Sequence, residues 1–172
     1  TDELKMSSYP ADANAPAVIL YKMTDVSYEI FNGNFKVISD VRVKIKVLKP
    51  DGKDEANVEI PYVYDQIKID ARESVNGLKA TAYNLENDKV VKTNMTKDMI
   101  FTERIDKRNM LLKFTVPQVK VGTVIEYKYR LESSLYYTID DWYAQTSIPT
   151  LYAEYHLVIP EYFKFNIEET GM

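Results

Sequence analysis

The chain contains no cysteine and only one histidine, His156. The absence of cysteine excludes disulfides, a thiolate nucleophile and Cys-ligated zinc within these residues. No apolar run approaches the roughly 20 residues of a membrane span, and no signal peptide is recognisable. The net charge of −4 provides no basic field that would attract a phosphate backbone, so we expect neither a membrane span nor a nucleic-acid partner.

What the chain does contain is typical of a globular β protein. Of its 172 residues, 45% are hydrophobic and 28% are charged, which allows a full core and argues against disorder. Its fourteen tyrosines favour strands and half-buried positions. We expect one domain over residues 1–172, with residues 1–16 as an N-terminal extension. Because the chain starts at Thr1 and stops at Met172 just after a strand-like stretch, we also expect it to be part of a longer protein.

Residues 110–133 carry the clearest paired-strand pattern. Apolar and polar residues alternate on both sides of a break at 117–122, which places one set of side chains on a buried face. Pro117 cannot donate a ladder hydrogen bond and Gly122 can adopt a positive φ, so both strands should end there. We therefore expect residues 110–133 to form an antiparallel hairpin.

Similar alternation extends along most of the chain. Residues 25–31 and 35–49 should form a hairpin around Asn32-Gly33-Asn34, with a bulge where Ile38 and Ser39 break the alternation. About ten to twelve strands separated by turn signals, without a long helix, predict an all-β fold, an antiparallel β-sandwich with at most short helical turns. The further strand-like segments are 18–21, 56–62, 78–85, 90–95, 136–145, 151–159 and 162–168.

No group of residues has the spacing of a catalytic or metal site. His156 alternates with Glu154 and Val158, as expected of a half-exposed strand residue; a hydrolase using His156 and a carboxylate is the weakest hypothesis. Oxygen-rich residues 84–88 lack the spacing of a calcium loop and predict a turn. We expect no catalytic residue, cofactor or metal site. The adjacent carboxylates Asp54-Glu55, Asp140-Asp141 and Glu168-Glu169 are interpreted as solvated turn residues.

Two surfaces remain candidates for binding. The basic side of strand 35–49 either contacts an acidic partner or is a solvated face that discourages sheet pairing. Four aromatic residues near Asp140-Asp141 could belong to the core, to an interdomain face, or to a platform for a sugar ring or peptide. The basic residues are Lys36, Arg42, Lys44, Lys46 and Lys49, and the aromatic residues are Tyr136, Tyr137, Trp142 and Tyr143.

Several short motifs, in a fixed order, resemble a known family. They include Phe114-Thr-Val-Pro117, Val121-Gly122 through Glu126-Tyr127, Trp142-Tyr-Ala-Gln145 and Glu154-Tyr155. This set is similar to a bacterial domain of unknown function that precedes a transglutaminase-like domain in exported proteins. The resemblance covers residues 4–165.

The resemblance implies an all-β N-terminal module followed by a papain-like domain, whose Cys, His and Asp would perform any acyl chemistry. It also implies an exported protein, periplasmic or at the cell surface. We therefore expect a non-catalytic accessory domain that packs on a downstream transglutaminase-like or protease-like domain or presents substrate to it. The alternative is a module that binds a glycan or peptide through exposed Tyr136, Tyr137, Trp142 and Tyr143.

Overall fold

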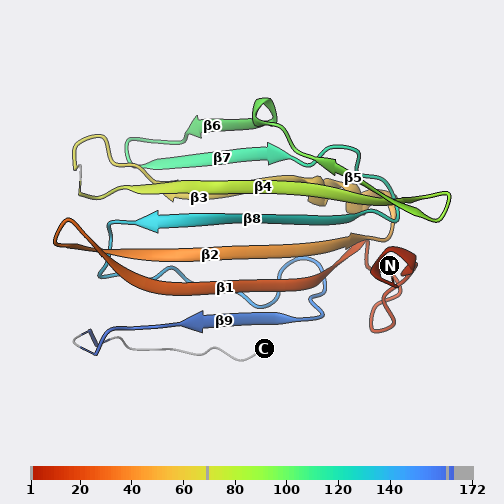
Figure 1. Ribbon diagram of the computed structural model, residues 1–172, viewed down its shortest axis with the longest axis horizontal. Coiled ribbons are helices and arrows are strands. Elements are labelled where there is room, and N and C mark those ends of the chain that lie inside the picture. The colour runs from red at the N-terminus through yellow and green to blue at the C-terminus, as the bar shows by residue number, and fades with distance from the viewer. Residues whose placement is uncertain (1, 69, 162, 165–172) are drawn as a thin grey trace.

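The computed structural model describes residues 2–68, 70–161 and 163–164, and within them the chain forms nine strands in two sheets (Figure 1). The larger sheet has the order β5-β4-β8-β2-β1-β9 and the smaller one β3-β7-β6. The predicted β-sandwich-like, mostly β fold is confirmed. The strands are β1 (Ala17–Phe31), β2 (Asn34–Val47), β3 (Asn57–Val63), β4 (Glu73–Glu86), β5 (Lys89–Asn94), β6 (Ile100–Arg104), β7 (Asn109–Thr115), β8 (Val124–Ser133) and β9 (Ala153–Leu157).

Within the described residues, helical structure is limited to three short segments. These are α1 (Asp2–Lys5) and the 3₁₀ turns η1 (Pro50–Ala56) and η2 (Lys97–Met99). None of the helices in the described residues is long and apolar enough to cross a membrane. This agrees with the expectation of at most short helical turns.

The β1–β2 hairpin forms as the sequence predicts. Phe31 pairs with Asn34, and Asn32 and Gly33 have φ values of 50° and 78°, the positive pair required by a tight two-residue turn. The bulge predicted at Ile38 and Ser39 is wrong, because the β1–β2 register is unbroken there. Ile38 is simply buried on the face where its neighbours are polar. The register shift lies instead in β1, between Ile19 and Tyr21.

The hairpin predicted over residues 110–133 is wrong, because β7 and β8 belong to different sheets. Both strands end near Pro117 and Gly122 as expected, but the connection crosses from one sheet to the other instead of folding back within one. Phe114 of β7 and Tyr127 of β8 then meet across the sandwich, with ring centroids 5.6 Å apart at 74°. Alternation shows which side chains are buried, but it does not specify the neighbouring strand.

Asn84 holds this sheet-to-sheet connection in place. Its amide donates to the Gln118 carbonyl at 3.0 Å, and its carbonyl accepts from the Thr123 hydroxyl at 2.6 Å. Asn84 and Thr123 are both buried. The turn predicted from Asn84 onward is therefore displaced: Asn84 is a strand residue, and the positive φ angles of the turn are at Asn87 and Asp88.

The strand predicted over 78–85 is longer than expected. β4 begins at Glu73 and includes Asn76 and Gly77, and its pairing with β8 shifts between Asn76 and Lys79. Residues 136–145 are not a strand, since the chain from 134 to 152 follows an irregular path. Of the strand predicted over 162–168, residues 162 and 165–168 lie outside the described residues, and 163–164 are not in a strand.

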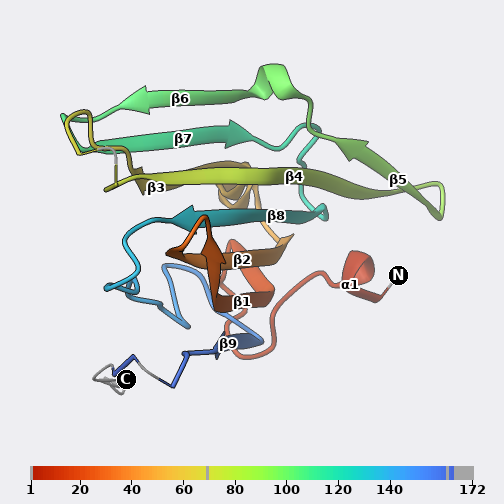
Figure 2. The same ribbon diagram turned by 60° about the vertical axis from the view of Figure 1, so that its left-hand side comes forward.

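The inner face of the large sheet is the face that packs on the small sheet. Ile45 and Ile125 of the large sheet join Leu112 and Phe114 of the small sheet in one buried cluster. The opposite, outer face is partly covered by the N-terminal extension, where Lys46 is fully buried and donates to the Leu4 and Gly122 carbonyls. The small sheet does not cover the whole inner face: β2, β1 and β9 lie on the side of the large sheet that is farthest from β7 and β6 (Figure 1 and Figure 2).

Candidate functional site

Residues 134–152 are here called the crossing segment. Its last residues, from Pro149 to Tyr152, run beside β1 with main-chain hydrogen bonds, and the part before them passes over the inner face of β1. Three side-chain hydrogen bonds hold that earlier part. The Tyr28 hydroxyl donates to the Tyr136 carbonyl at 3.0 Å, and the Lys22 ammonium donates to the Tyr143 carbonyl at 2.7 Å. The Trp142 indole N–H donates to the Thr24 hydroxyl at 3.1 Å. The crossing segment therefore covers the part of the inner face that extends beyond the small sheet.

A cleft of about 690 Å³ lies between the crossing segment, β3 and the inner face of the large sheet. We call it the inner cleft. Its walls combine apolar and aromatic side chains with a few acidic ones, a composition common in protein and ligand contacts. Its lining includes Ile60, Tyr62, Glu73, Asp140, Trp142 and Tyr155.

Strand β3 is an edge of the small sheet, yet few of its backbone donors are free. The Asn57 N–H donates to the Asp54 carbonyl, and the Val63 N–H donates to the buried Glu73 carboxylate at 2.8 Å. Pro61 has no N–H. In an antiparallel strand the N–H groups of every second residue point to the same neighbour. Those of Asn57 and Val63 point away from β7, so Glu59 is the one remaining β3 residue whose N–H points the same way.

The four aromatic residues predicted as binding candidates occupy two groups. Tyr136 packs on Tyr137, with centroids 5.7 Å apart, and on Phe35 and Phe163. Trp142 and Tyr143 lie in the second group, near Lys22. Tyr137 and Tyr143 are 62% and 66% exposed, so each presents most of a ring to solvent.

Trp142 is a fixed wall of the inner cleft. Its ring lies 5.3 Å from the Tyr155 ring, and the Lys22 ammonium lies 5.3 Å above the Trp142 centroid. Burial lowers the pKa of Lys22, and the contact with the indole ring offsets part of its desolvation. Because the indole N–H is already donated to Thr24, Trp142 has no free donor for a sugar hydroxyl.

Tyr129 contributes a neutral hydroxyl to the same cleft. Burial raises the pKa of Tyr129 to about 12, so its phenol stays protonated at neutral pH. Sequence alternation predicts the buried side of Tyr129, but the cleft itself depends on the path of the crossing segment. The one signal for that path in the sequence is the cluster of aromatic residues after Ser134.

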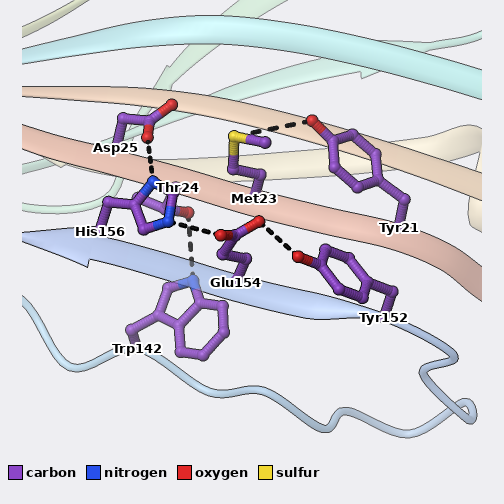
Figure 3. A network of polar contacts seen from close by, with 8 residues as sticks. All are labelled: Tyr21, Met23, Thr24, Asp25, Trp142, Tyr152, Glu154 and His156. Atoms are coloured by element: carbon purple, nitrogen blue, oxygen red, sulfur yellow. Dashed lines mark hydrogen bonds and ion pairs between the residues drawn. The ribbon is translucent and has the colours of Figure 1, made fainter.

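On the outer face of the large sheet, where β9 pairs with β1, His156 lies between the carboxylates of Asp25 and Glu154 (Figure 3). Its Nδ1 is 2.9 Å from Asp25 Oδ1, and its Nε2 is 2.5 Å from Glu154 Oε1. The Tyr152 hydroxyl donates to the other Glu154 oxygen at 2.6 Å. Hydrogen bonds to Asp25 and then to Glu154 raise the pKa of His156, since both carboxylates favour the doubly protonated ring.

This arrangement does not resemble a general base. His156 lies in β9 as predicted, and its side chain is 53% exposed. Carboxylates within hydrogen-bond distance are present, as a His-dependent hydrolase requires, but they engage both ring nitrogens. An imidazolium bonded at both nitrogens has no lone pair with which to accept a proton from a nucleophile.

Two of the three adjacent acidic pairs lie in the described residues. Asp54 and Glu55 lie in η1, while Asp140 and Asp141 lie in the crossing segment and line the inner cleft. Among the described residues, no three His, Cys, Asp or Glu side chains gather in a way that could hold a metal ion. Glu168 and Glu169 lie outside the described residues.

Comparison with known protein families identifies the chain. The sequence model of the family described as "Domain of Unknown Function with solved-structure structure (DUF3857)" matches residues 34–171, well over half of the chain. The chain belongs to the DUF3857 family. Membership in a domain family of unknown function is thus confirmed. No curated protein matches the chain.

Among solved structures, this DUF3857 domain is similar to one described as "crystal structure of a putative protease from Parabacteroides distasonis ATCC 8503". The TM-score is 0.52 at 10% sequence identity, so the likeness is one of fold. The match covers 69% of this chain but only 23% of the other chain.

Proposed function

We propose that this DUF3857 chain is a non-catalytic accessory domain of an exported bacterial transglutaminase-like or protease-like protein, periplasmic or at the cell surface. In this role it packs on the catalytic domain or presents substrate to it. The observation that carries the proposal is the inner cleft, an open and largely apolar surface beside exposed aromatic side chains. Such surfaces on a folded domain are typical of protein contacts.

The similar structure supports a role beside a larger catalytic unit. Its match to this chain occupies only 23% of a chain described as a "putative protease", which leaves most of that protein outside the shared fold. The present chain has no cysteine, and its single histidine is bonded at both ring nitrogens. The acyl chemistry of a papain-like site would therefore reside in the downstream domain.

A second candidate function is binding of a cell-surface glycan or peptide. The exposed rings of Tyr137 and Tyr143 favour it, because an aromatic face free in solvent can stack on a sugar or an apolar side chain. Tyr136 and Trp142 contribute less to this function, since both are packed on other rings.

The test combines this chain with the remainder of its natural polypeptide and follows the fluorescence of its single tryptophan, Trp142. The accessory role predicts a saturable change in Trp142 emission and a higher midpoint of thermal unfolding for both parts. Tyr143→Ser should weaken the association about tenfold, because a well-placed aromatic contact contributes more than 1 kcal/mol.

Phe101→Ser is the matched control, since Phe101 is 66% exposed on β6 and does not line the inner cleft. It should leave the association unchanged. If the two parts neither bind nor alter each other's unfolding, the accessory role is wrong. A glycan or peptide panel that changes Trp142 emission under those conditions would favour the second candidate.

A further inference from the structure

The basic side chains on the outer face of the large sheet differ in whether they have partners. Lys36, Lys44 and Arg130 each pair with a carboxylate, at 3.5, 3.3 and 2.8 Å. Arg42, Lys128 and Lys79 form no side-chain hydrogen bond or ion pair with any residue that the structure describes. We call these three residues the cation row.

The pairing of the strands brings the cation row together. Arg42 lies directly opposite Lys128 in the β2–β8 ladder, and Lys128 lies directly opposite Lys79 in the β8–β4 ladder. Directly opposite Cβ atoms are about 5 Å apart, so the row spans about 10 Å. Like charges in this position repel one another and reduce stability. All three residues are exposed.

A shallow depression of about 340 Å³ adjoins the row. Its lining combines Arg42 and Lys128 with Asn76, Gly77, Val41, Tyr129 and the paired Asp40 and Arg130, while Lys79 is not part of it. The β4 register shifts at this point, and such a bulge leaves one residue without a ladder partner. Gly77 has φ +62°, and no atom lies within 4 Å of the position its Cβ would occupy, so the space above it is open.

The neighbouring ion pair indicates which anion would fit. Arg130 Nε and Nη2 donate to the two Asp40 oxygens at 2.9 and 2.8 Å, so one guanidinium alone matches one carboxylate. Three adjacent cations call for an anion with more charge and more acceptor oxygens. A phosphate group carries about −1.5 to −2 charges at pH 7 and three acceptor oxygens.

We propose that the cation row of Arg42, Lys128 and Lys79 is a binding site for a phosphate group, either free in solution or on a lipid head group. The site lies on the outer face, whereas the accessory role proposed above depends on the inner cleft. The two proposals can therefore succeed or fail independently.

The test is a titration with inorganic phosphate at low ionic strength, where charge interactions are least screened. Binding is followed by the thermal unfolding midpoint and by NMR signals of the sheet. Lys128→Gln removes the central cation, and because a charge-assisted hydrogen bond contributes about 1.5–3 kcal/mol, phosphate should bind about tenfold more weakly or worse. In phosphate-free buffer the same variant should unfold at a higher temperature, because the repulsion within the row is relieved.

Lys92→Gln is the matched control: Lys92 lies on the same sheet with its ammonium over the Tyr83 ring, and the substitution removes the same charge. It should leave phosphate binding unchanged. Phosphatidic acid vesicles, whose head group is a phosphomonoester, reveal a lipid source, with phosphatidylcholine vesicles as reference. Lys128-dependent binding to those vesicles alone assigns the phosphate to a head group, and Lys128-dependent binding of inorganic phosphate assigns it to solution. Binding to neither, or equal losses in Lys128→Gln and Lys92→Gln, overturns the proposal.

Discussion

The rings of Phe114 and Tyr127 meet at 74° across the two sheets, only thirteen positions apart in a sequence that alternates on both sides of them. The chain between them passes from the small sheet to the large one. Phe114 is buried, and burial raises the pKa of Tyr127 above the ordinary range of tyrosine. This contact joins the two sheets at the centre of the core.

Phe114→Ala should destabilise the fold strongly. Removing a buried phenylalanine leaves a cavity and typically costs about 3–5 kcal/mol. Urea denaturation of the variant and the parent protein measures this difference. Phe101→Ala, an exposed substitution on the same sheet, should change the free energy of unfolding by less than about 0.5 kcal/mol. Equal effects of the two variants would contradict the placement of Phe114 between the sheets.

Asn84 and Thr123 should be energetically coupled. Asn84→Ala leaves the Gln118 carbonyl without its side-chain donor and the Thr123 hydroxyl without its acceptor, although Thr123 Oγ1 still accepts from the Lys120 N–H; a buried unsatisfied group costs about 1–3 kcal/mol. Thr123→Val removes the other half of the pair. A double-mutant cycle by chemical denaturation should give a coupling energy of about 0.5–3 kcal/mol. Additive losses would show that the two residues act separately.

His156 should make the protein more stable below neutral pH than above it. Its pKa in the folded protein is raised above 6.5 by the bonds to Asp25 and Glu154. The stabilisation is therefore complete below pH 6.5 and is lost as the pH rises through the folded pKa. The single histidine allows a direct NMR titration of this pKa.

Asp25→Asn should lower the pKa of His156 and flatten the dependence of stability on pH. Glu59→Gln serves as the control. It removes a carboxylate from β3 of the small sheet, whereas His156 lies in β9 of the large sheet. If the pKa of His156 in the parent protein is 6.5 or lower, the hydrogen bonds of its ring to Asp25 and Glu154 are absent in solution.

Thr24 should control the environment of Trp142. Thr24→Val keeps the shape of the side chain but leaves the indole N–H without its acceptor, at a cost of about 1–3 kcal/mol. The emission of the single tryptophan should shift as the ring loosens. Thr24→Ser retains the hydroxyl and should preserve the parent spectrum. The same spectrum for Thr24→Val would show that the bond does not hold the ring.

Local chemistry predicts the parts of this fold that depend on neighbouring residues. Asn32-Gly33 specifies the β1–β2 hairpin because a tight turn needs two positive φ values. The break at 117–122 has no such signature, and the sequence therefore gives no sign that β7 and β8 separate into two sheets. The partners of Phe114 are set by long-range packing.

The candidate sites show the same division. The alternation of the sequence correctly places Arg42, Lys44 and Lys46 on one face of β2. It does not predict that the N-terminal extension buries Lys46, or that Arg42 lies opposite Lys128 of β8. The aromatic residues of 136–143 resemble a strand in sequence. They lie outside the ladder and bond to side chains of β1 instead: Tyr28 and Lys22 donate to the Tyr136 and Tyr143 carbonyls, and the Trp142 indole donates to Thr24.

The exposed edge of β3 determines whether a partner of the inner cleft is recognised through its main chain or through its side chains. With Pro61 lacking a donor and the N–H groups of Asn57 and Val63 already used, Glu59 is the one β3 residue whose N–H is left for an incoming segment, which therefore cannot form a continuous main-chain ladder along β3. Main-chain hydrogen bonds are nearly the same for all residues, so pairing through them would distinguish little between partner sequences. A partner of this cleft must instead be distinguished by the shape and chemistry of its side chains, so single substitutions in the partner should discriminate strongly between binding and non-binding.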